Sequence, residues 1–227
     1  MAPMAEPQSR SPWLDIPLAD YEGHMSDPGI GQSRMLADQF AHLLEAHRPD
    51  SVAILGCAGG NGLDRLRADV TRRVVCIDIN PQYIERLAAR YAAVIPGIEV
   101  HVRDVEQPLG GIAPVDLIYI PLVFEYVDPG TGLRNLRAIC RPGGILAAML
   151  QLPCDHAAAV SESPFTSMRG LAAAMRLVAP AELAAAAAAA GFLPRSEGRV
   201  HLPSGKAFSI RVFDGPSQPG VDQLIRR

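Results

Sequence analysis

Two patterns of apolar residues alternate along this chain. Short continuous runs rich in valine and isoleucine are typical of buried strands and cover residues 52–55, 73–78, 98–102, 115–120 and 145–150. Segments in which apolar residues recur every three or four positions are typical of amphipathic helices and cover residues 31–47, 81–91 and 133–140. Strands that alternate with helices predict a parallel sheet with helices on both faces, which is a Rossmann-like α/β fold.

The pattern changes after residue 153. Helices are expected over residues 166–177 and 180–190, and strands over residues 192–198 and 207–213. The two strands are separated by a Ser204-Gly205 turn and are expected to pair antiparallel. With the five earlier strands they predict a seven-stranded sheet, mostly parallel, with an antiparallel pair at its C-terminal end.

A glycine-rich turn follows the first predicted strand, in the sequence VAILGCAGGNGL at residues 52–63. Glycine adopts positive φ without strain and has no Cβ, so the backbone can approach a ligand closely. A helix that begins after such a turn points free N–H groups at an anionic or polar ligand. The turn, together with a helix expected after it, predicts a site for a nucleotide-like cofactor.

Two acidic residues stand where predicted strands end. Ligands of open α/β sheets bind at the carboxyl ends of the strands, so Asp78 and Asp104 are expected beside the glycine turn. Asp78 follows that turn by roughly 20 residues, the spacing of an acid that accepts from ribose hydroxyls. Asp104 and the Val105 N–H would meet an adenine ring, against which Ile79 would pack. The alternatives are a capping role for Asp78 and a turn-forming role for Asp104.

The glycine spacing excludes two common nucleotide sites. Counted from Gly56, the third position is Ala58 and the sixth is Asn61, which breaks the G-x-G-x-x-G pattern of dinucleotide sites. The P-loop pattern G-x-x-x-x-G-K-[ST] is absent as well, because Lys206 follows Ser204-Gly205 and precedes Ala207. An adenosine cofactor other than NAD or a nucleoside triphosphate is therefore favoured.

Composition and charge limit the kinds of molecule that this protein is expected to bind. The net charge of −3 and the isoelectric point near 6.1 provide no basic field for a phosphate backbone, so a small-molecule acceptor is expected rather than nucleic acid. The four cysteines lack metal-site spacing and are expected to be reduced thiols, and no metal is expected. Residues 1–12 read as a disordered leader without an apolar core, and no run reaches membrane-spanning length. A cytoplasmic protein without a membrane partner is expected, and its oligomeric state stays open.

These features together resemble the class I S-adenosylmethionine-dependent methyltransferases, over residues 31–213. The sequence GCAGGNG at residues 56–62 is similar to the first motif of that family, whose backbone surrounds the methionine part of the cofactor. Asp78 matches its ribose-binding acid and Asp104-Val105 its adenine-binding pair. The rim DLIYIPLVFEYV at 116–127 and the turn CRPGGIL at 140–146 resemble its fourth strand and the entry to its fifth.

The resemblance implies a domain plan and a reaction. A lid over residues 13–30 precedes a single methyltransferase-like domain at 31–215, and a tail covers 216–227. The implied reaction moves a methyl group from S-adenosylmethionine to an acceptor by in-line displacement and leaves S-adenosylhomocysteine. Two positions depart from the first motif: Ala58 replaces its usual middle glycine, and Ile54 an acidic residue. Because of these two positions, a protein that binds the cofactor without catalysis is an alternative function. A second alternative, an NAD-dependent oxidoreductase, is disfavoured by the glycine spacing.

The resemblance and the positions of the motifs assign candidate site residues. Those for the cofactor are Gly56, Cys57, Ala58, Gly60, Asp78, Ile79, Asp104, Val105 and Pro121. Those for the substrate are Tyr126 and Gln151, and those for catalysis are Tyr21, His24 and Glu125, with His156 and His201 as further bases. The alternatives are a packing role for Tyr21, a solvated His24 and a packed helix-sheet connection around Gln151.

Overall fold

A seven-stranded mixed sheet forms the centre of the computed structural model, which describes residues 11–154 and 158–216. Its strands run in the order β3-β2-β1-β4-β5-β7-β6. They are β1 (Ser51–Leu55), β2 (Arg73–Asp78), β3 (Ile98–Val102), β4 (Val115–Pro121), β5 (Cys140–Gln151), β6 (Leu193–His201) and β7 (Ala207–Asp214). The first five are parallel, whereas β7 pairs antiparallel with β5 and β6. The predicted fold class is confirmed.

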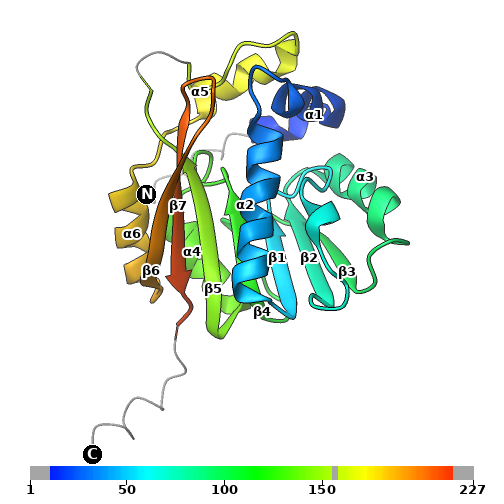
Figure 1. Ribbon diagram of the computed structural model, residues 1–227, viewed down its shortest axis with the longest axis vertical. Coiled ribbons are helices and arrows are strands. Elements are labelled where there is room, and N and C mark those ends of the chain that lie inside the picture. Colours follow the sequence, from blue (N-terminus) through cyan, green and yellow to red (C-terminus); the bar gives the residue numbers. More distant parts are fainter. Residues whose placement is uncertain (1–10, 155–157, 217–227) are drawn as a thin grey trace, which may run out of the picture.

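Helices cover both faces of the sheet (Figure 1). One face packs against α2 (Gln32–His47) and α3 (Pro81–Tyr91), and the other against α4 (Pro129–Leu136) and α6 (Pro180–Ala189). A third group, α1 (Leu18–Ser26), α5 (Leu171–Ala174) and the 3₁₀ turns Pro12–Asp15 and Thr166–Gly170, lies over the carboxyl ends of the parallel strands (Figure 1). None of the helices in the described part of the chain combines the length and apolar character needed to cross a membrane.

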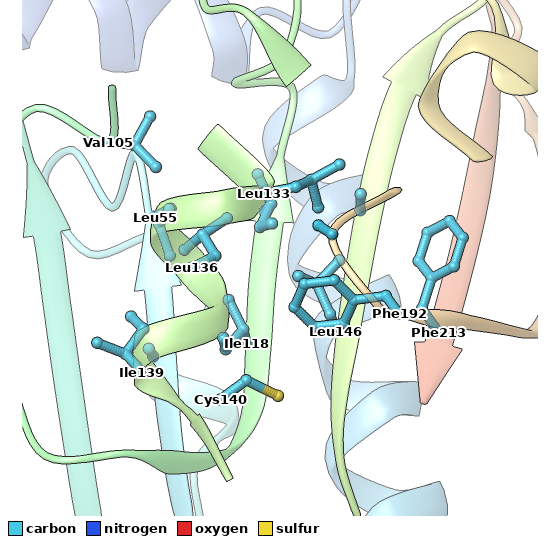
Figure 2. Close-up of a cluster of buried hydrophobic side chains, with 14 of the residues drawn as sticks. Leu55, Val105, Ile118, Leu133, Leu136, Ile139, Cys140, Leu146, Phe192 and Phe213 are labelled. Atoms are coloured by element: carbon cyan, nitrogen blue, oxygen red, sulfur yellow. The ribbon is translucent and has the colours of Figure 1, made fainter. Parts of the chain in front are cut away.

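Alternation along the strands divides the core into two layers. In β1, Ala53 and Leu55 pack toward α4 and α6, while Val52 and Ile54 pack toward α2 and α3. Because successive side chains of a strand point to opposite faces, a strand buried on both faces reads as one continuous apolar run. Figure 2 shows the first layer, in which Leu133 and Leu136 of α4 lie beside Ile118 of β4.

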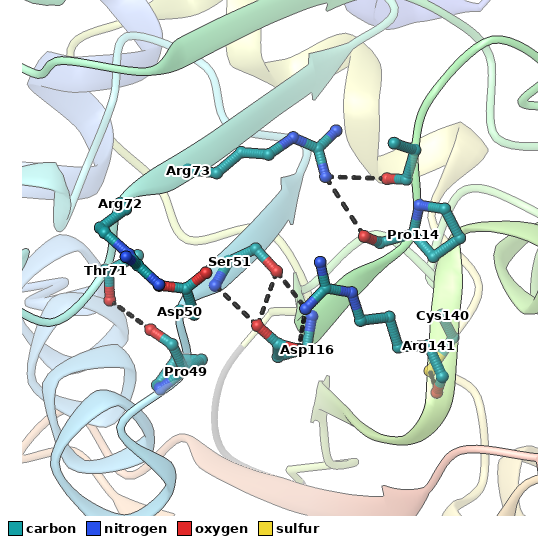
Figure 3. Close-up of polar contacts among 11 residues, drawn as sticks. Pro49, Asp50, Ser51, Thr71, Arg72, Arg73, Pro114, Asp116, Cys140 and Arg141 are labelled. Atoms are coloured by element: carbon teal, nitrogen blue, oxygen red, sulfur yellow. Dashed lines mark hydrogen bonds and ion pairs between the residues drawn. The ribbon is translucent and has the colours of Figure 1, made fainter.

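Polar contacts fasten the opposite end of the sheet, away from the carboxyl ends (Figure 3). The Ser51 N–H and hydroxyl both donate to Asp116 Oδ2, at 2.8 and 2.7 Å, and Arg141 donates to Asp116 Oδ1 at 2.7 Å. Arg73 donates to the carbonyl oxygens of Ala113 and Pro114. These contacts connect the N-terminal ends of β1, β2, β4 and β5. They hold the strands in register at the end of the sheet opposite the predicted ligand site.

Helix starts follow local capping chemistry. The Asn80 side chain accepts from the Gln82 N–H and Pro81 occupies the first turn of α3, as expected from the sequence. The same arrangement begins α4, where Asp128 accepts from the Thr131 N–H and Pro129 follows. The predicted helix over 133–140 is therefore wrong at both ends: α4 starts four residues earlier, and Cys140 already belongs to β5.

The helix expected directly after the glycine turn is absent. Residues Leu63–Arg65 form only a 3₁₀ turn, preceded by Gly60 and Gly62 with φ of 97° and 85°. Two left-handed residues within three positions turn the chain out of a right-handed helix before it can propagate. The loop therefore presents backbone groups without a helix N-terminus behind them.

The helix expected over 166–177 is also wrong in extent. The 3₁₀ turn Thr166–Gly170 leads into α5, which ends at Ala174 because Met175 is extended and the Arg176 N–H donates to the Glu125 carbonyl oxygen at 2.8 Å. The predicted lid at 13–30 contains α1, a helix that the apolar pattern did not indicate. The proposed leader at 1–12 and tail at 216–227 lie almost wholly outside the described residues.

Candidate active site

A pocket lies at the carboxyl ends of the central strands, where the strand order reverses between β1 and β4. Its floor is made by residues that follow β1, β2 and β4, and its cover by α1 and the 3₁₀ turns. It brings together eleven of the predicted site residues: Tyr21, His24, Gly56, Ala58, Asp78, Ile79, Asp104, Val105, Pro121, Tyr126 and Gln151. Cys57, Gly60 and Glu125 do not line it.

Asp78 fixes the glycine loop to the end of β2. Its carboxylate is buried; Oδ2 accepts from the Ala58 N–H and Oδ1 from the Asn80 N–H, both at 2.9 Å. Burial raises the pKa of Asp78, against the effect of these backbone donors. A carboxylate has about four lone-pair sites, so capacity is left for hydroxyl groups of a ligand in the pocket. Asp78 can therefore accept from backbone N–H groups, as the capping alternative expects, and still bind the hydroxyl groups of a ligand.

The loop itself is held in a left-handed conformation. Gly56 has φ of 62° and Gly60 of 97°, and a Cβ on Gly56 would lie 2.8 Å from Val123 Cγ2. Ala58, at 4% exposure, has φ of 44°. Alanine adopts this left-handed conformation at a steric cost, and the hydrogen bond from the Ala58 N–H to Asp78 holds the residue in it.

The pocket continues past the end of β3. Asp104 Oδ1 accepts from the Glu106 N–H at 2.9 Å, so this side chain does form the turn that the alternative interpretation assigned to it. Val105 and Ile79 lie beside it on the pocket wall, and Arg103 lines the same end. This corner offers one carboxylate, backbone groups and an apolar surface, the set of contacts an adenine ring needs.

Aromatic rings close the pocket from above. Trp13 makes edge contacts with Tyr21 and Tyr126, with ring centroids 5.7 and 5.0 Å apart, and Tyr21 stacks on Tyr83 at 6.1 Å. Trp13 is fixed in turn by its carbonyl oxygen, which accepts from Asn80 Nδ2 at 2.8 Å. Trp13 and Tyr83 were not predicted as site residues. Trp13 is the one tryptophan of the chain, which was the signal available in the sequence.

Helix α1 is tied to both sides of the pocket. Glu22 pairs with Arg90 of α3, whose Nη1 also donates to the Gly59 carbonyl oxygen at 3.1 Å. On the other side, Asp20 accepts from the Ser167 hydroxyl at 2.6 Å, and His24 Nδ1 lies 2.8 Å from Ser163 Oγ. The helix therefore joins the glycine loop to the segment that follows β5.

The three catalytic candidates have different environments. Burial, then the negative charge of Asp78, raises the pKa of Tyr21, so its phenol stays protonated at neutral pH. Burial, then the positive charge of Lys206, lowers the pKa of His24, so its ring is neutral there and able to accept a proton. His24 is buried, which corrects the solvated alternative. Of the further bases, His201 is exposed and does not line the pocket, and His156 lies outside the described residues.

Glu125 is buried behind the pocket wall. Its Oε1 accepts from the Gln151 N–H at 2.7 Å, whereas Oε2 has no partner among the described residues. Burial raises the pKa of Glu125 to about 7. This carboxyl group holds the end of β5, and with it the Gln151 side chain that does line the pocket.

The Rossmann-like sheet with an antiparallel last pair, and the glycine loop bound to an acid at the end of β2, agree with the resemblance to class I methyltransferases. Residues 54–146 match the family model described as a methyltransferase domain. The tRNA 5-carboxymethoxyuridine methyltransferase of Escherichia coli (strain K12) is 32% identical over 108 residues, which cover 44% of this chain and 41% of that protein. The chain thus spans about two fifths of the length of this curated relative.

Solved structures share the fold over most of the chain. The Burkholderia thailandensis 1,6-didemethyltoxoflavin-N1-methyltransferase, crystallised with its acceptor and S-adenosylhomocysteine, has a TM-score of 0.65 at 20% identity and covers 96% of this chain and 93% of its own. The N-methyltransferase NodS of Bradyrhizobium japonicum WM9 has a TM-score of 0.63 at 20% identity, with coverages of 85% and 91%. The [4+2]-cyclase SpnF reaches 0.61 at 13% identity, with coverages of 79% and 82%. Residues 54–146 of the chain thus match a methyltransferase domain, and the solved structures share the fold of the chain.

Proposed function

We propose that this protein transfers a methyl group from S-adenosylmethionine to a small-molecule acceptor. One observation carries the proposal: a single pocket contains both a cofactor side and an acceptor side. The glycine loop, the Asp78 carboxylate and the corner at Asp104 form the first, and Tyr126 and Gln151 form the second. The fold and the family match support the cofactor. The enclosed aromatic cover and the lack of a net positive charge support an acceptor that enters the pocket whole.

The residues present fit the cofactor. The loop backbone at Gly56 and Ala58 would hold its amino-acid part, Asp78 its ribose hydroxyls, and Ile79 with Asp104 its adenine. Gly56 leaves space that a Cβ would fill against Val123, and Asp78 keeps lone pairs for hydroxyl donors. When bound, S-adenosylmethionine supplies a methyl group that is already activated on sulfur.

The protein's contribution to methyl transfer is orientation and exclusion of water. Pro121 and Tyr126 line the pocket in which the two substrates would meet, and the aromatic cover would keep water from the reacting atoms. Where the acceptor must lose a proton, His24 is the residue we assign to it. Its ring is neutral near pH 7, and in the tautomer whose Nδ1–H donates to the Ser163 hydroxyl, Nε2 is the atom that would take the proton.

The cofactor assignment is tested by calorimetric titration of the protein with S-adenosylhomocysteine and, separately, with NAD. We expect S-adenosylhomocysteine to bind, and at 100 times its Kd to stabilise the fold by about 2.7 kcal/mol. NAD should do neither. Binding of NAD without S-adenosylhomocysteine would overturn the proposal.

Asp78→Asn is the variant that localises the cofactor. An amide has one acceptor oxygen, so its NH₂ group must oppose either the Ala58 or the Asn80 N–H, and it loses acceptor capacity toward ribose. We expect the affinity for S-adenosylhomocysteine to fall at least tenfold, about 1.4 kcal/mol. The matched control is Asp64→Asn, an exposed acid in the 3₁₀ turn after the same loop, which should leave the affinity unchanged.

The size of the acceptor is tested with methyl-labelled S-adenosylmethionine. One reaction set contains pooled small molecules and the other contains bulk tRNA, since the curated relative is named for a tRNA nucleoside. We expect label in the small-molecule fraction. Label in tRNA alone would contradict the proposed acceptor class, and cofactor binding without any transfer would favour the non-catalytic alternative.

A further inference from the structure

Lys206 is buried in the acceptor side of the pocket. It follows the Ser204-Gly205 turn between β6 and β7, is 2% exposed, and lines the pocket together with His24 and Gln151. In Figure 1 the tip of this hairpin lies at the same end of the sheet as α1 and α5. The sequence pattern around Lys206 excludes a P-loop but does not predict that this residue is buried in the pocket.

This residue is the one lysine in a chain with twenty arginines. Several arginines, such as Arg67, Arg72 and Arg176, form exposed ion pairs with acids. Lys206 has no ion pair among the described residues, although a buried charge without a counter-charge is costly. A compact ammonium group therefore stands in the pocket with no negative charge from the described part of the chain to balance it.

Two donors of the pocket converge on one carbonyl oxygen. Lys206 Nζ donates to the Ala159 carbonyl oxygen at 2.7 Å, and Gln151 Nε2 donates to the same atom at 2.8 Å. Both side chains are almost fully buried. The geometry already brings an ammonium and an amide donor to a single oxygen, and an ammonium has three N–H donors, of which this contact uses one.

We propose that Lys206 and Gln151 form a subsite for a carboxylate group of the methyl acceptor. An acceptor carboxylate would supply the missing negative charge and would occupy the donors that now meet at Ala159. One ammonium and one amide match a single negative charge, whereas a phosphate monoester carries nearly two and presents three acceptor oxygens. The proposal rests on the proposed methyl transfer, because it names the acceptor's chemical class.

A purely structural role makes different predictions. If Lys206 served only to anchor the segment around Ala159, the pocket would not distinguish a carboxylate from a neutral group of the same shape. Binding of matched charged and neutral probes therefore separates the two roles, and it does so without knowledge of the natural acceptor.

The single lysine makes the measurement direct. In protein grown with lysine labelled with ¹³C at Cε, Lys206 gives the only side-chain signal of this kind. The protein is saturated with S-adenosylhomocysteine and titrated with benzoate, benzamide and phenyl phosphate. We expect benzoate to shift the Lys206 signal in a saturable way and to bind at least tenfold tighter than benzamide. Equal effects of benzoate and benzamide, or no shift with either, would overturn the proposal, and tighter binding of phenyl phosphate would replace the carboxylate with a phosphate group.

Variants place the effect at this residue. Lys206→Met keeps the length of the side chain without its charge and should lose the preference for benzoate over benzamide, measured by calorimetry, while Lys206→Arg should retain part of it. Arg199→Met, which removes an exposed cation from β6, is the matched control and should change nothing. A preference that survives in Lys206→Met would overturn the proposal.

Asp155→Asn tests for a counter-charge within the chain. Asp155 lies outside the described residues, and the proposal expects its removal to leave benzoate binding unchanged. Binding that becomes more than tenfold tighter would show that the lysine is already neutralised, and would overturn the proposal. Affinity for S-adenosylhomocysteine is measured in every variant; its retention in Lys206→Met separates failure of the carboxylate subsite from failure of the cofactor assignment.

Discussion

Ala58 stands where the first motif of class I methyltransferases usually has glycine, and the structure shows what this alanine does to the backbone. Its φ of 44° is one that alanine adopts at a cost, and its N–H is bound to the acid that would hold the ribose. The hydrogen bond from Ala58 to Asp78 therefore offsets the steric cost of this backbone conformation, and it also shapes the proposed cofactor site.

Ala58→Gly should stabilise the protein. Removing the Cβ relieves the left-handed strain, which outweighs the added backbone entropy of glycine, and we expect the free energy of unfolding to rise by about 1 kcal/mol. Chemical denaturation measures it. Ala89→Gly is the control on the exposed side of α3, where the same change should lower stability by about 1 kcal/mol. A loss of stability in both variants would contradict the strain at Ala58.

At the scale of single residues, the sequence was informative where a side chain stands at the end of a strand. Asp78, Ile79, Asp104 and Val105 all line the pocket because the register of a parallel sheet brings strand ends together. Lys206 was not predictable in this way. It enters the pocket from a hairpin between antiparallel strands, and its burial depends on tertiary contacts that no local pattern encodes.

Among the elements, α1 forms part of the cover of the pocket. It carries Tyr21 and His24 into the cover and is tied to the glycine loop through Glu22 and Arg90. The tie is partly exposed, so it contributes little to overall stability, but it acts where a cofactor would enter.

Arg90→Met should release this tie. We expect S-adenosylhomocysteine to dissociate several times faster, while the free energy of unfolding changes by less than about 1 kcal/mol, because a partly exposed ion pair contributes little. Stopped-flow displacement measures the rate. Arg86→Met, on the exposed side of the same helix, is the control and should leave the rate unchanged. Equal rates in both variants would show that the contact does not restrain the cover.

The predicted elements failed where glycine or tertiary contacts overrode a local pattern. After the loop, left-handed Gly60 and Gly62 prevent the expected helix, and after β5 a backbone bond to Glu125 ends α5 early. By contrast, α3 was predicted accurately, because Asn80 and Pro81 fix its start through local chemistry. Elements defined by their own residues are readable from sequence, and those that end on a distant contact are not.

For the molecule as a whole, Glu125 links stability to pH. Its pKa is raised from 4.5 to about 7 by burial, so the folded protein holds this proton over a range in which the unfolded chain has lost it. The contribution to stability is fully present below about pH 4.5 and is lost as pH rises to about 7. Its total size is about 3 kcal/mol.

Glu125→Gln removes this dependence, because the amide cannot ionise and its oxygen can still accept from the Gln151 N–H. The difference in free energy of unfolding between parent and variant should therefore change by about 3 kcal/mol between pH 4 and pH 8, with the parent losing stability as pH rises. Denaturant titrations at several pH values measure it. A difference that is constant with pH would show that the pKa of Glu125 is the same in the folded and the unfolded protein, so that burial does not raise it.

The global fold was the most predictable level. Alternating buried strands and amphipathic helices leave few arrangements other than a doubly wound sheet, and the seven-stranded order confirms it. The domain limits, in contrast, stay predictions, since the proposed leader and tail fall largely on residues outside the described part of the chain.

The cover formed by α1 and Trp13 has a kinetic consequence. In the proposed methyl transfer, a cofactor beneath these aromatic rings would leave after the cover moves, so each cycle would include an opening step that is separate from the chemistry. For an enzyme built this way, we expect the release of S-adenosylhomocysteine to limit the steady-state turnover. The first turnover would then run faster than those that follow, and added viscosogen would slow the later ones.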